Sequence, residues 1–198
     1  MSIRPILEFC FRKFDNKPIN VLEIGARYGE SSKLILKHLN VNEYTIVDPY
    51  TSYDDYKRDG FDEIISLDKE DTIFNRVKTE LTKINNNVKF YKTYSNNKET
   101  IDSIEDESID LIFIDGNHSY KYVLEDLENY APKLKKNGVL CGDDFFMRLH
   151  KNDVLNTGAS YDEPMVYEAV IDYCKKHNKE YREFGKHRGY GKLFYIVN

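Results

Sequence analysis

The sequence has few cysteines, no long apolar run and no excess of positive charge, and each shortage excludes a class of protein. Its three cysteines are widely spaced and odd in number, which is typical of reduced thiols rather than of a disulfide or zinc framework. No apolar run approaches the roughly 20 residues of a membrane-spanning helix. The net charge of -5 disfavours nucleic-acid binding, which favours a basic surface.

The first residues also lack the apolar core and the small-residue cleavage site of a signal peptide, so we expect a cytoplasmic protein. What is present is a hydrophobic fraction of 40% and a charged fraction of 32%, as in a globular protein. There is no internal repeat or linker. We therefore expect a single domain over residues 1–198, with a short leading helix within 2–14 and a candidate lid over 145–164.

Strand-like and helix-like segments alternate along the chain, which predicts an α/β fold with a doubly wound, mainly parallel sheet. The run at 109–115 is almost continuously apolar, as expected of a central strand that is buried on both faces. Asn137 and Gly138 predict a turn before the fifth strand, and a glycine-rich turn predicts that the last two strands pair antiparallel. The predicted strands are 20–24, 44–48, 88–91, 109–115, 139–142, 181–184 and 192–197, and the predicted helices are 3–14, 31–39, 69–84, 98–103, 119–130 and 165–176.

Two glycines, Gly25 and Gly29, follow the first predicted strand and precede a helix. Glycines there permit a sharp turn and close approach of a ligand to the backbone, next to the free N–H groups of a helix start. The spacing differs from the Gly-x-Gly-x-x-Gly of dinucleotide folds. Glu23 would also lie near a pyrophosphate, which disfavours NAD and favours a ligand with a positively charged amino-acid end.

Asp48 ends the second predicted strand, about 20 residues after Gly29. In nucleoside-binding sheets, an acid at this place accepts hydrogen bonds from the ribose hydroxyls. The alternative is an ordinary turn with an acid before a proline. Glycines and acid together resemble the first two motifs of the class I S-adenosylmethionine-dependent methyltransferases. The resemblance implies a Rossmann-like seven-stranded sheet of order 3-2-1-4-5-7-6 with strand 7 antiparallel. It implies these cofactor-binding residues: Glu23, Gly25, Gly29, Asp48, Tyr94, Ser95 and Asp115.

Three acids follow the fourth and fifth predicted strands: Asp115, then Asp143 and Asp144. The carboxyl ends of adjacent central strands meet at the crevice where ligands bind, so the three carboxylates are expected to converge. Three carboxylates so close together repel one another unless a cation or a proton lies between them. Carboxylate oxygens are suitable ligands for Mg²⁺. The alternative is that each acid caps a helix or a turn.

The run from Ile114 to Tyr120, with Asp143 and Asp144, is similar to a metal-dependent branch that methylates sugar hydroxyls of macrolide and aminocoumarin antibiotics or of glycans. This resemblance implies Asp115, Asp143 and Asp144 as Mg²⁺ ligands and makes Asp115 part of the catalytic centre. Several of those enzymes have an acidic base two residues after the first ligand, whereas this chain has Asn117. The base role then falls on His118, whose alternative is a structural or capping role.

We therefore expect a Mg²⁺-assisted O-methyltransferase that uses S-adenosylmethionine and acts on a sugar or nucleotide sugar. One alternative is a methyltransferase of catechol-like phenols, although the polar residues Arg148, His150 and Lys151 of the candidate lid favour a sugar. Another is a cofactor-binding protein without catalysis. Homodimers are common in the branch that the chain resembles, and the sequence leaves a monomer equally open.

Overall fold

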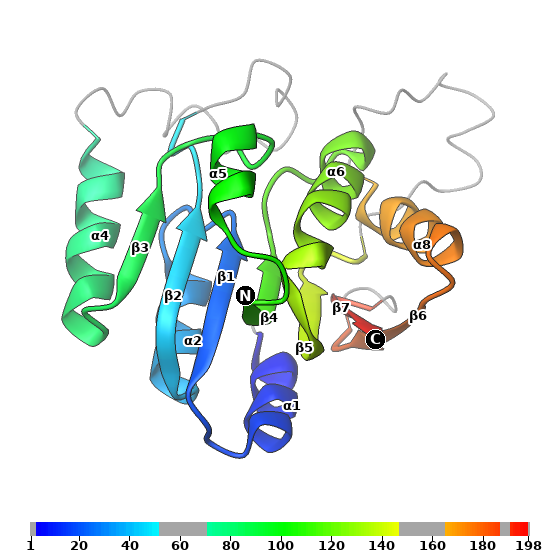
Figure 1. Ribbon diagram of the computed structural model, residues 1–198, viewed down its shortest axis with the longest axis horizontal. Helices are drawn as coiled ribbons and strands as arrows, with labels where there is room; N and C mark the ends of the chain where they lie inside the picture. The colour runs from blue at the N-terminus through cyan, green and yellow to red at the C-terminus, as the bar shows by residue number, and fades with distance from the viewer. Residues whose placement is uncertain (1–2, 52–70, 147–164, 187–190, 198) are drawn as a thin grey trace.

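The computed structural model describes residues 3–51, 71–146, 165–186 and 191–197 (Figure 1). Seven strands form one sheet in the order β3-β2-β1-β4-β5-β7-β6, which confirms the predicted α/β class and strand order. The elements are α1 (Arg4–Phe14), β1 (Ile19–Ile24), α2 (Glu30–His38), β2 (Val41–Val47), α4 (Thr72–Ile84), β3 (Val88–Tyr91), α5 (Lys98–Ser103), β4 (Ile109–Ile114), α6 (Tyr120–Tyr130), a 3-10 turn (Ala131–Lys133), β5 (Leu134–Gly142), α8 (Val166–Lys176), β6 (Glu180–Phe184) and β7 (Leu193–Val197).

The first five strands are parallel, and β7 runs antiparallel to both of its neighbours, β5 and β6. The central strand of the seven is β4, and in the neighbouring strand β1 Val21 pairs with Leu111 and Ile24 with Ile114. This register brings the carboxyl ends of the two strands to the same level. The residues that follow β1 and β4 therefore lie side by side, as the doubly wound pattern predicts.

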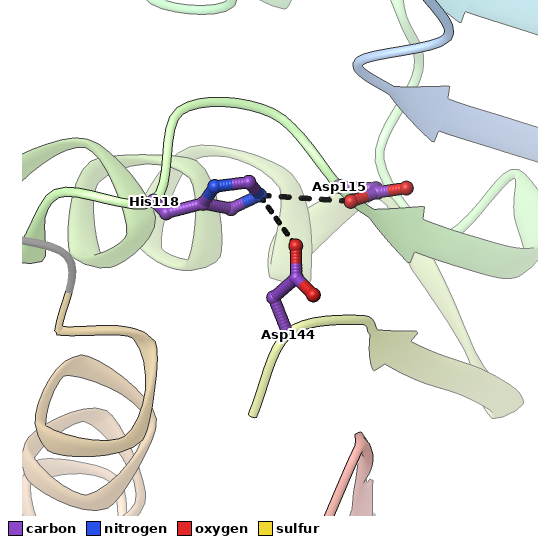
Figure 2. A group of neighbouring side chains, drawn as sticks. All are labelled: Asp115, His118 and Asp144. Atoms are coloured by element: carbon purple, nitrogen blue, oxygen red, sulfur yellow. Dashed lines mark ion pairs between the residues drawn. The ribbon is translucent and has the colours of Figure 1, made fainter. Parts of the chain in front are cut away.

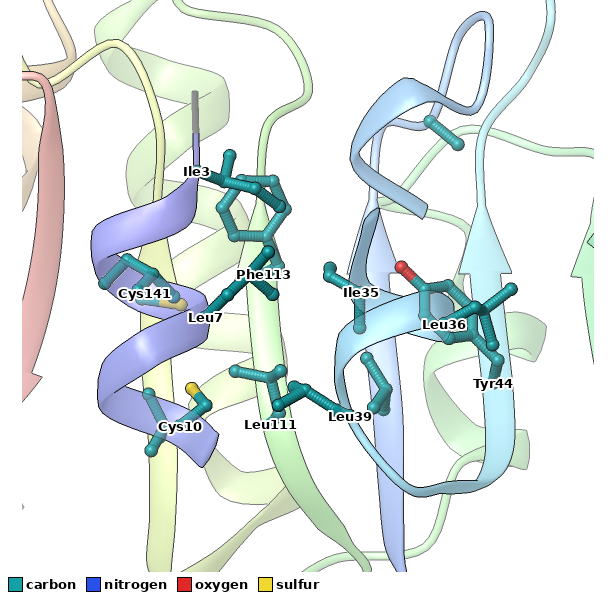
Figure 3. Packing of buried hydrophobic residues seen from close by; sticks show 14 of the residues in the cluster. Ile3, Leu7, Cys10, Ile35, Leu36, Leu39, Tyr44, Leu111, Phe113 and Cys141 are labelled. Atoms are coloured by element: carbon teal, nitrogen blue, oxygen red, sulfur yellow. The ribbon is translucent and has the colours of Figure 1, made fainter. Parts of the chain in front are cut away.

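Helices cover both faces of the sheet (Figure 1). One apolar cluster joins α1, α2 and α4 to the first face, and Figure 3 shows Leu7, Cys10, Ile35 and Phe113 within it. A second cluster joins α6 and α8 to the other face. Burial on both faces is the reason that β4 consists almost entirely of isoleucine, leucine and phenylalanine.

Helix α6 begins beside the carboxyl end of β4 and packs on the second face through Val123 and Leu127, both buried. The helix ends at Tyr130 and passes into the 3-10 turn that contains Pro132. A proline at this place lacks the N–H that another helical turn requires, as the sequence predicts. Helix α6 therefore packs against α8 and ends at this turn.

The prediction of a turn at Asn137 and Gly138 is wrong, because both residues lie within β5, which begins at Leu134. The pairing of β4 with β5 is irregular between Ile109 and Leu111. A Cβ on Gly138 would come within 2.6 Å of the Leu134 side chain and 3.0 Å of the Asp110 carbonyl oxygen. The glycine therefore permits close approach of two strands at a bulge, a use that its sequence neighbours do not distinguish from a turn.

The candidate lid lies outside the described residues, apart from Phe145 and Phe146. The described cysteines Cys10, Cys141 and Cys174 are all buried as free thiols, in agreement with the prediction from their spacing. Within the four described ranges, no helix is both long and apolar enough to cross a membrane.

The packing of α6 can be tested by comparing Leu127→Ala with Leu124→Ala. Leu127 is fully buried, whereas Leu124 is only partly buried against the same cluster. We expect the first change to lower the free energy of unfolding by about 2–5 kcal/mol, because it leaves a cavity, and the second by less than half as much. Urea unfolding followed by circular dichroism measures both. Equal losses would contradict the position of α6.

Candidate functional site

The turn between β1 and α2 is built on left-handed backbone. Gly25 has φ of +83° and Gly29 of +71°, and Arg27 between them also has a positive φ. A Cβ on Gly25 would lie 2.2 Å from the carbonyl oxygen of Asp115, so only glycine permits this approach of the two strand ends. The predicted cofactor turn is therefore in direct backbone contact with the first predicted metal ligand.

Asp48 holds this turn in place. Its Oδ2 accepts hydrogen bonds from the backbone N–H groups of Ala26 at 2.7 Å and Arg27 at 2.8 Å, and its Oδ1 accepts one from Tyr50 at 2.7 Å. Burial raises the pKa of the carboxyl group, and the three N–H donors act in the opposite direction. Oδ2 already uses both of its lone pairs on two N–H groups, whereas Oδ1 has a second lone pair for a ribose hydroxyl, a contact that stays a prediction.

Glu23 lies completely buried beneath the same turn. Its carboxyl group accepts hydrogen bonds from the hydroxyls of Ser31, Ser32 and Tyr44. Burial raises its pKa to about 7 despite these donors. The group thus anchors the first turn of α2 to β1, and its predicted contact with a cofactor amino group stays a prediction.

Tyr94 and Ser95, the residues predicted to flank an adenine, follow β3 in a tight turn. The Tyr94 carbonyl accepts the N–H of Asn97 at 3.0 Å, and the Ser95 carbonyl accepts the hydroxyl of Tyr130 at 2.6 Å. Tyr94 is 43% exposed, so its side chain is presented at the surface of this turn. Asn97 then caps α5 by accepting the N–H of Thr100.

Three titratable side chains converge at the ends of β4 and β5 (Figure 2). His118 Nε2 lies 3.1 Å from Asp144 Oδ2 and 3.7 Å from Asp115 Oδ1. The donor atoms of all three residues lie within 4.8 Å of one another, and Asp144 is buried. This compact set of two carboxylates and an imidazole could bind a divalent cation, or could accept and hold a proton.

Asp143 lies beside this cluster, but its side chain is oriented differently. Its Oδ1 accepts the N–H of Asp144 at 2.7 Å, as expected if Asp143 caps a turn instead of binding a metal. Its Oδ2 is buried without a hydrogen-bond partner among the residues that the structure describes. Burial, together with the charges of Asp115 and Asp144, raises the pKa of Asp143 to about 7. The sequence predicted a trio of aspartates, whereas His118 occupies the third place of the compact set.

Asn117 stands where an acidic base is found in several enzymes of the branch that the chain resembles. Its Oδ1 accepts the N–H of Ser119, the N-cap residue of α6, at 2.9 Å. This bond orders the turn that leads into α6, which begins at Tyr120. A charged carboxylate is absent from this position, and His118 is the next side chain along the chain.

Asp126, an acid on the buried face of α6 that is only 2% exposed, is not among the site residues predicted from the sequence. Its side chain hydrogen-bonds with that of Ser95, and burial raises its pKa to about 7. A Cβ on Gly116 would lie 3.5 Å from its Oδ2. The signal was present: Asp126 lies three residues after Val123 and beside Leu127, on the apolar stripe of the helix.

A family model described as a methyltransferase domain matches residues 22–145, which include the glycine turn and all of the clustered acids. An uncharacterized protein of Acanthamoeba polyphaga mimivirus is 26% identical over 142 residues, 71% of this chain and 58% of that protein. The chain spans less than two thirds of the length of the curated relatives it matches.

Solved structures share the fold. An O-methyltransferase from Bacillus cereus, solved in complex with SAH, has a TM-score of 0.64 at 15% identity, over 100% of this chain and 81% of its own. The O-methyltransferase TomG from Streptomyces achromogenes, solved in complex with SAM, has a TM-score of 0.63 at 11% identity, over 100% and 80%.

Two buried tyrosines beside the glycine turn give a matched pair of variants. The Tyr44 hydroxyl donates to Glu23 at 2.9 Å, whereas the buried Tyr50 hydroxyl has no partner among the described residues. We expect Tyr44→Phe to lower the free energy of unfolding by about 1–2 kcal/mol and Tyr50→Phe to raise it by about 1 kcal/mol, because only the second change removes an unsatisfied group. Urea titration measures both, and a loss of stability in Tyr50→Phe would contradict the assignment.

The raised pKa of Glu23 predicts that stability falls as pH rises. The unfolded chain loses the proton near the ordinary value of 4.5, but the native state retains it up to about 7. The native state therefore binds more protons within this window, and stability that is complete below pH 4.5 is lost progressively as pH approaches 7. We expect Glu23→Gln to reduce the slope by up to about 1.4 kcal/mol per pH unit, measured by urea unfolding at pH 5, 6 and 7. An unchanged slope would show that Glu23 titrates normally.

Proposed function

This chain belongs to the methyltransferase-domain family, and from that premise we propose that it transfers the methyl group of S-adenosylmethionine to a sugar hydroxyl with the help of a divalent cation. The observation that carries the proposal is the convergence of Asp115, His118 and Asp144 at two adjacent strand ends. This cluster lies directly beside the glycine turn, through the contact of Gly25 with Asp115. A methyl donor on the turn and an acceptor hydroxyl at the cluster would then be neighbours.

The cofactor would lie across the ends of β1 and β4. The Gly25–Gly29 turn permits a close approach next to the N–H groups at the start of α2, and Asp48 Oδ1 has a spare lone pair for the ribose. Tyr94 and Ser95 would flank the adenine. The cofactors named for the Bacillus cereus and Streptomyces achromogenes structures, SAH and SAM, support this choice. S-adenosylmethionine contains no pyrophosphate, so the buried Glu23 would not repel it as it would repel a dinucleotide.

The residues present fit a hard divalent cation such as Mg²⁺. Asp115 and Asp144 offer carboxylate oxygens close together, and the buried Oδ2 of Asp143 has no partner within the described part of the chain. A neighbouring positive charge would relieve the repulsion and desolvation that raise the Asp143 pKa. When bound, Mg²⁺ lowers the pKa of a coordinated substrate hydroxyl and sets its direction.

His118 would remove the proton from the acceptor hydroxyl. Its Nε2 is the only imidazole nitrogen placed at the cluster among the described residues, 3.1 Å from Asp144. The Asp144 carboxylate lies beside this same nitrogen and would stabilise the imidazolium that forms. Methyl transfer requires the acceptor oxygen to lie in line with the bond between the sulfonium and the methyl group. Asp115 and Asp144 would position the acceptor oxygen for this attack.

A sugar hydroxyl is the proposed acceptor because the resemblance extends to the residues after β4 and β5 and because His118 supplies a base where Asn117 does not. A catechol-like phenol uses the same cation geometry and is the second candidate. A panel of nucleotide sugars and catechols, scored by release of S-adenosylhomocysteine, decides between them. Turnover of a sugar supports the proposal, and turnover of catechols alone rejects the sugar as substrate.

The cation and the base can be tested separately. We expect Asp144→Asn to lower kcat by at least about 100-fold and His118→Ala by about 10²–10⁴-fold, because the first change removes a ligand charge and the second removes the base. Chelation by EDTA should abolish turnover, and added Mg²⁺ should restore it. Asp102→Asn, which removes an exposed ion pair with Lys98, is the matched control and should keep full activity.

Binding must be measured alongside turnover. Calorimetry with S-adenosylhomocysteine should give comparable affinity for wild type, Asp144→Asn and His118→Ala, since none of these changes touches the glycine turn. Failure of the wild type to bind this compound would reject the methyltransferase proposal. Turnover that is insensitive to EDTA and to Asp144→Asn would reject the cation.

A further inference from the structure

The turn that follows β3 is attached to helix α6 by three side chains of that helix. The Tyr130 hydroxyl donates to the Ser95 carbonyl at 2.6 Å, and the side chains of Asp126 and Ser95 hydrogen-bond with each other. Glu125 accepts a longer, exposed hydrogen bond from Asn96. Residues 126 and 130 are four apart and therefore share one face of the helix. Helix α6 thus holds Ser95 through both its backbone and its side chain.

Asp126 is the unusual member of this group. It is only 2% exposed, and its Oδ1 has no hydrogen-bond partner within the described part of the chain. Burial raises its pKa to about 7, with a smaller contribution from the charge of Glu125 and an opposing one from the Ser95 hydrogen bond. An acid in an apolar stripe costs stability unless it is fully hydrogen-bonded. Packing alone does not account for its presence.

The surroundings of Asp126 connect two parts of the site. Its Oδ2 lies near Gly116, directly after Asp115, and its side chain reaches Ser95 at the end of the neighbouring turn. Helix α6 itself begins at Tyr120, two residues after His118. One rigid helix therefore meets the carboxylate cluster at its start and the turn after β3 at its middle.

We propose that Asp126 is a positioning residue for the nucleoside end of the cofactor site, and that it acts by holding Ser95 at a set distance from the end of β4. The inference rests on the proposed function, in which Tyr94 and Ser95 flank the adenine. Asp126 touches neither the acceptor nor the reacting methyl group. Its removal should therefore weaken cofactor binding and leave the chemical step intact.

The variants that test this are Asp126→Ala, Asp126→Asn, Ser95→Ala and the Asp126→Ala/Ser95→Ala double variant. Each is titrated with S-adenosylhomocysteine by calorimetry. We expect Asp126→Ala and Ser95→Ala each to raise Kd about tenfold, because each removes the same hydrogen bond. The double variant should be no weaker than the weaker single variant, since interacting residues are not additive. Asp126→Asn keeps an oxygen acceptor for Ser95 and should stay within about threefold of the wild type.

Kinetics separate positioning from loss of stability. Asp126→Ala should raise KM for S-adenosylmethionine about tenfold with kcat within about threefold, because Asp115, His118 and Asp144 are unchanged. Glu128→Gln is the matched control: Glu128 lies on α6 and pairs with Lys176 and His177 of the α8 end, so the change alters helix packing without touching Ser95. Its Kd should equal that of the wild type.

Each outcome decides between the alternatives. Fully additive effects of Asp126→Ala and Ser95→Ala, or a wild-type Kd in Ser95→Ala, would overturn the inference and leave the proposed function standing. If Asp126→Ala does not fold, Ser95→Ala and Asp126→Asn still decide. A wild-type protein that binds no S-adenosylhomocysteine would overturn the proposed function, and this inference with it.

Discussion

The close approach of β1 and β4 at their carboxyl ends is the constraint on which the site depends. The N–H of Asp115 donates to the carbonyl of Ile24 at 2.8 Å, and that of Gly25 donates to Val47 at 2.9 Å. A side chain at position 25 would lie 2.2 Å from the Asp115 carbonyl oxygen. The cofactor turn and the carboxylate cluster are consequently parts of one packed backbone unit, and a displacement of either moves the other.

Buried acids surround this unit, and each serves a different purpose. Asp48 is satisfied by three backbone N–H groups and fixes the turn, and Glu23 is satisfied by three hydroxyls and fixes the start of α2. Asp126 and Asp143 each retain an oxygen without a partner among the described residues. Buried carboxyl groups without hydrogen-bond partners reduce the stability of the fold. Folding therefore does not explain why such groups gather around one pair of strand ends, whereas a functional site does.

The fold was predictable from the sequence because burial on both sheet faces leaves an unmistakable apolar run, as at Ile109–Ile114, between turn residues. The side-chain directions at the cluster were not. Asp143 and Asp144 are adjacent acids of the same type, and only the backbone, with φ of 54° at Asp144, turns the second toward His118. The bulge at Gly138 depends on tertiary contacts, which the local pattern does not contain. The place of Asp126 on the apolar stripe of α6 is visible in the sequence, but its contact with Ser95 is not.

In the proposed function, the choice of His118 as the base is connected with the turn that precedes α6. Asn117 Oδ1 accepts the N–H of Ser119, and a carboxylate there could make the same bond, so this turn alone does not require an amide. An additional acid would stand beside Asp115, Asp143 and Asp144, where burial and repulsion already raise one pKa to about 7. An amide at 117 limits that repulsion. In the proposed mechanism, proton transfer falls to His118, which lies 3.1 Å from the Asp144 carboxylate that would stabilise its charge.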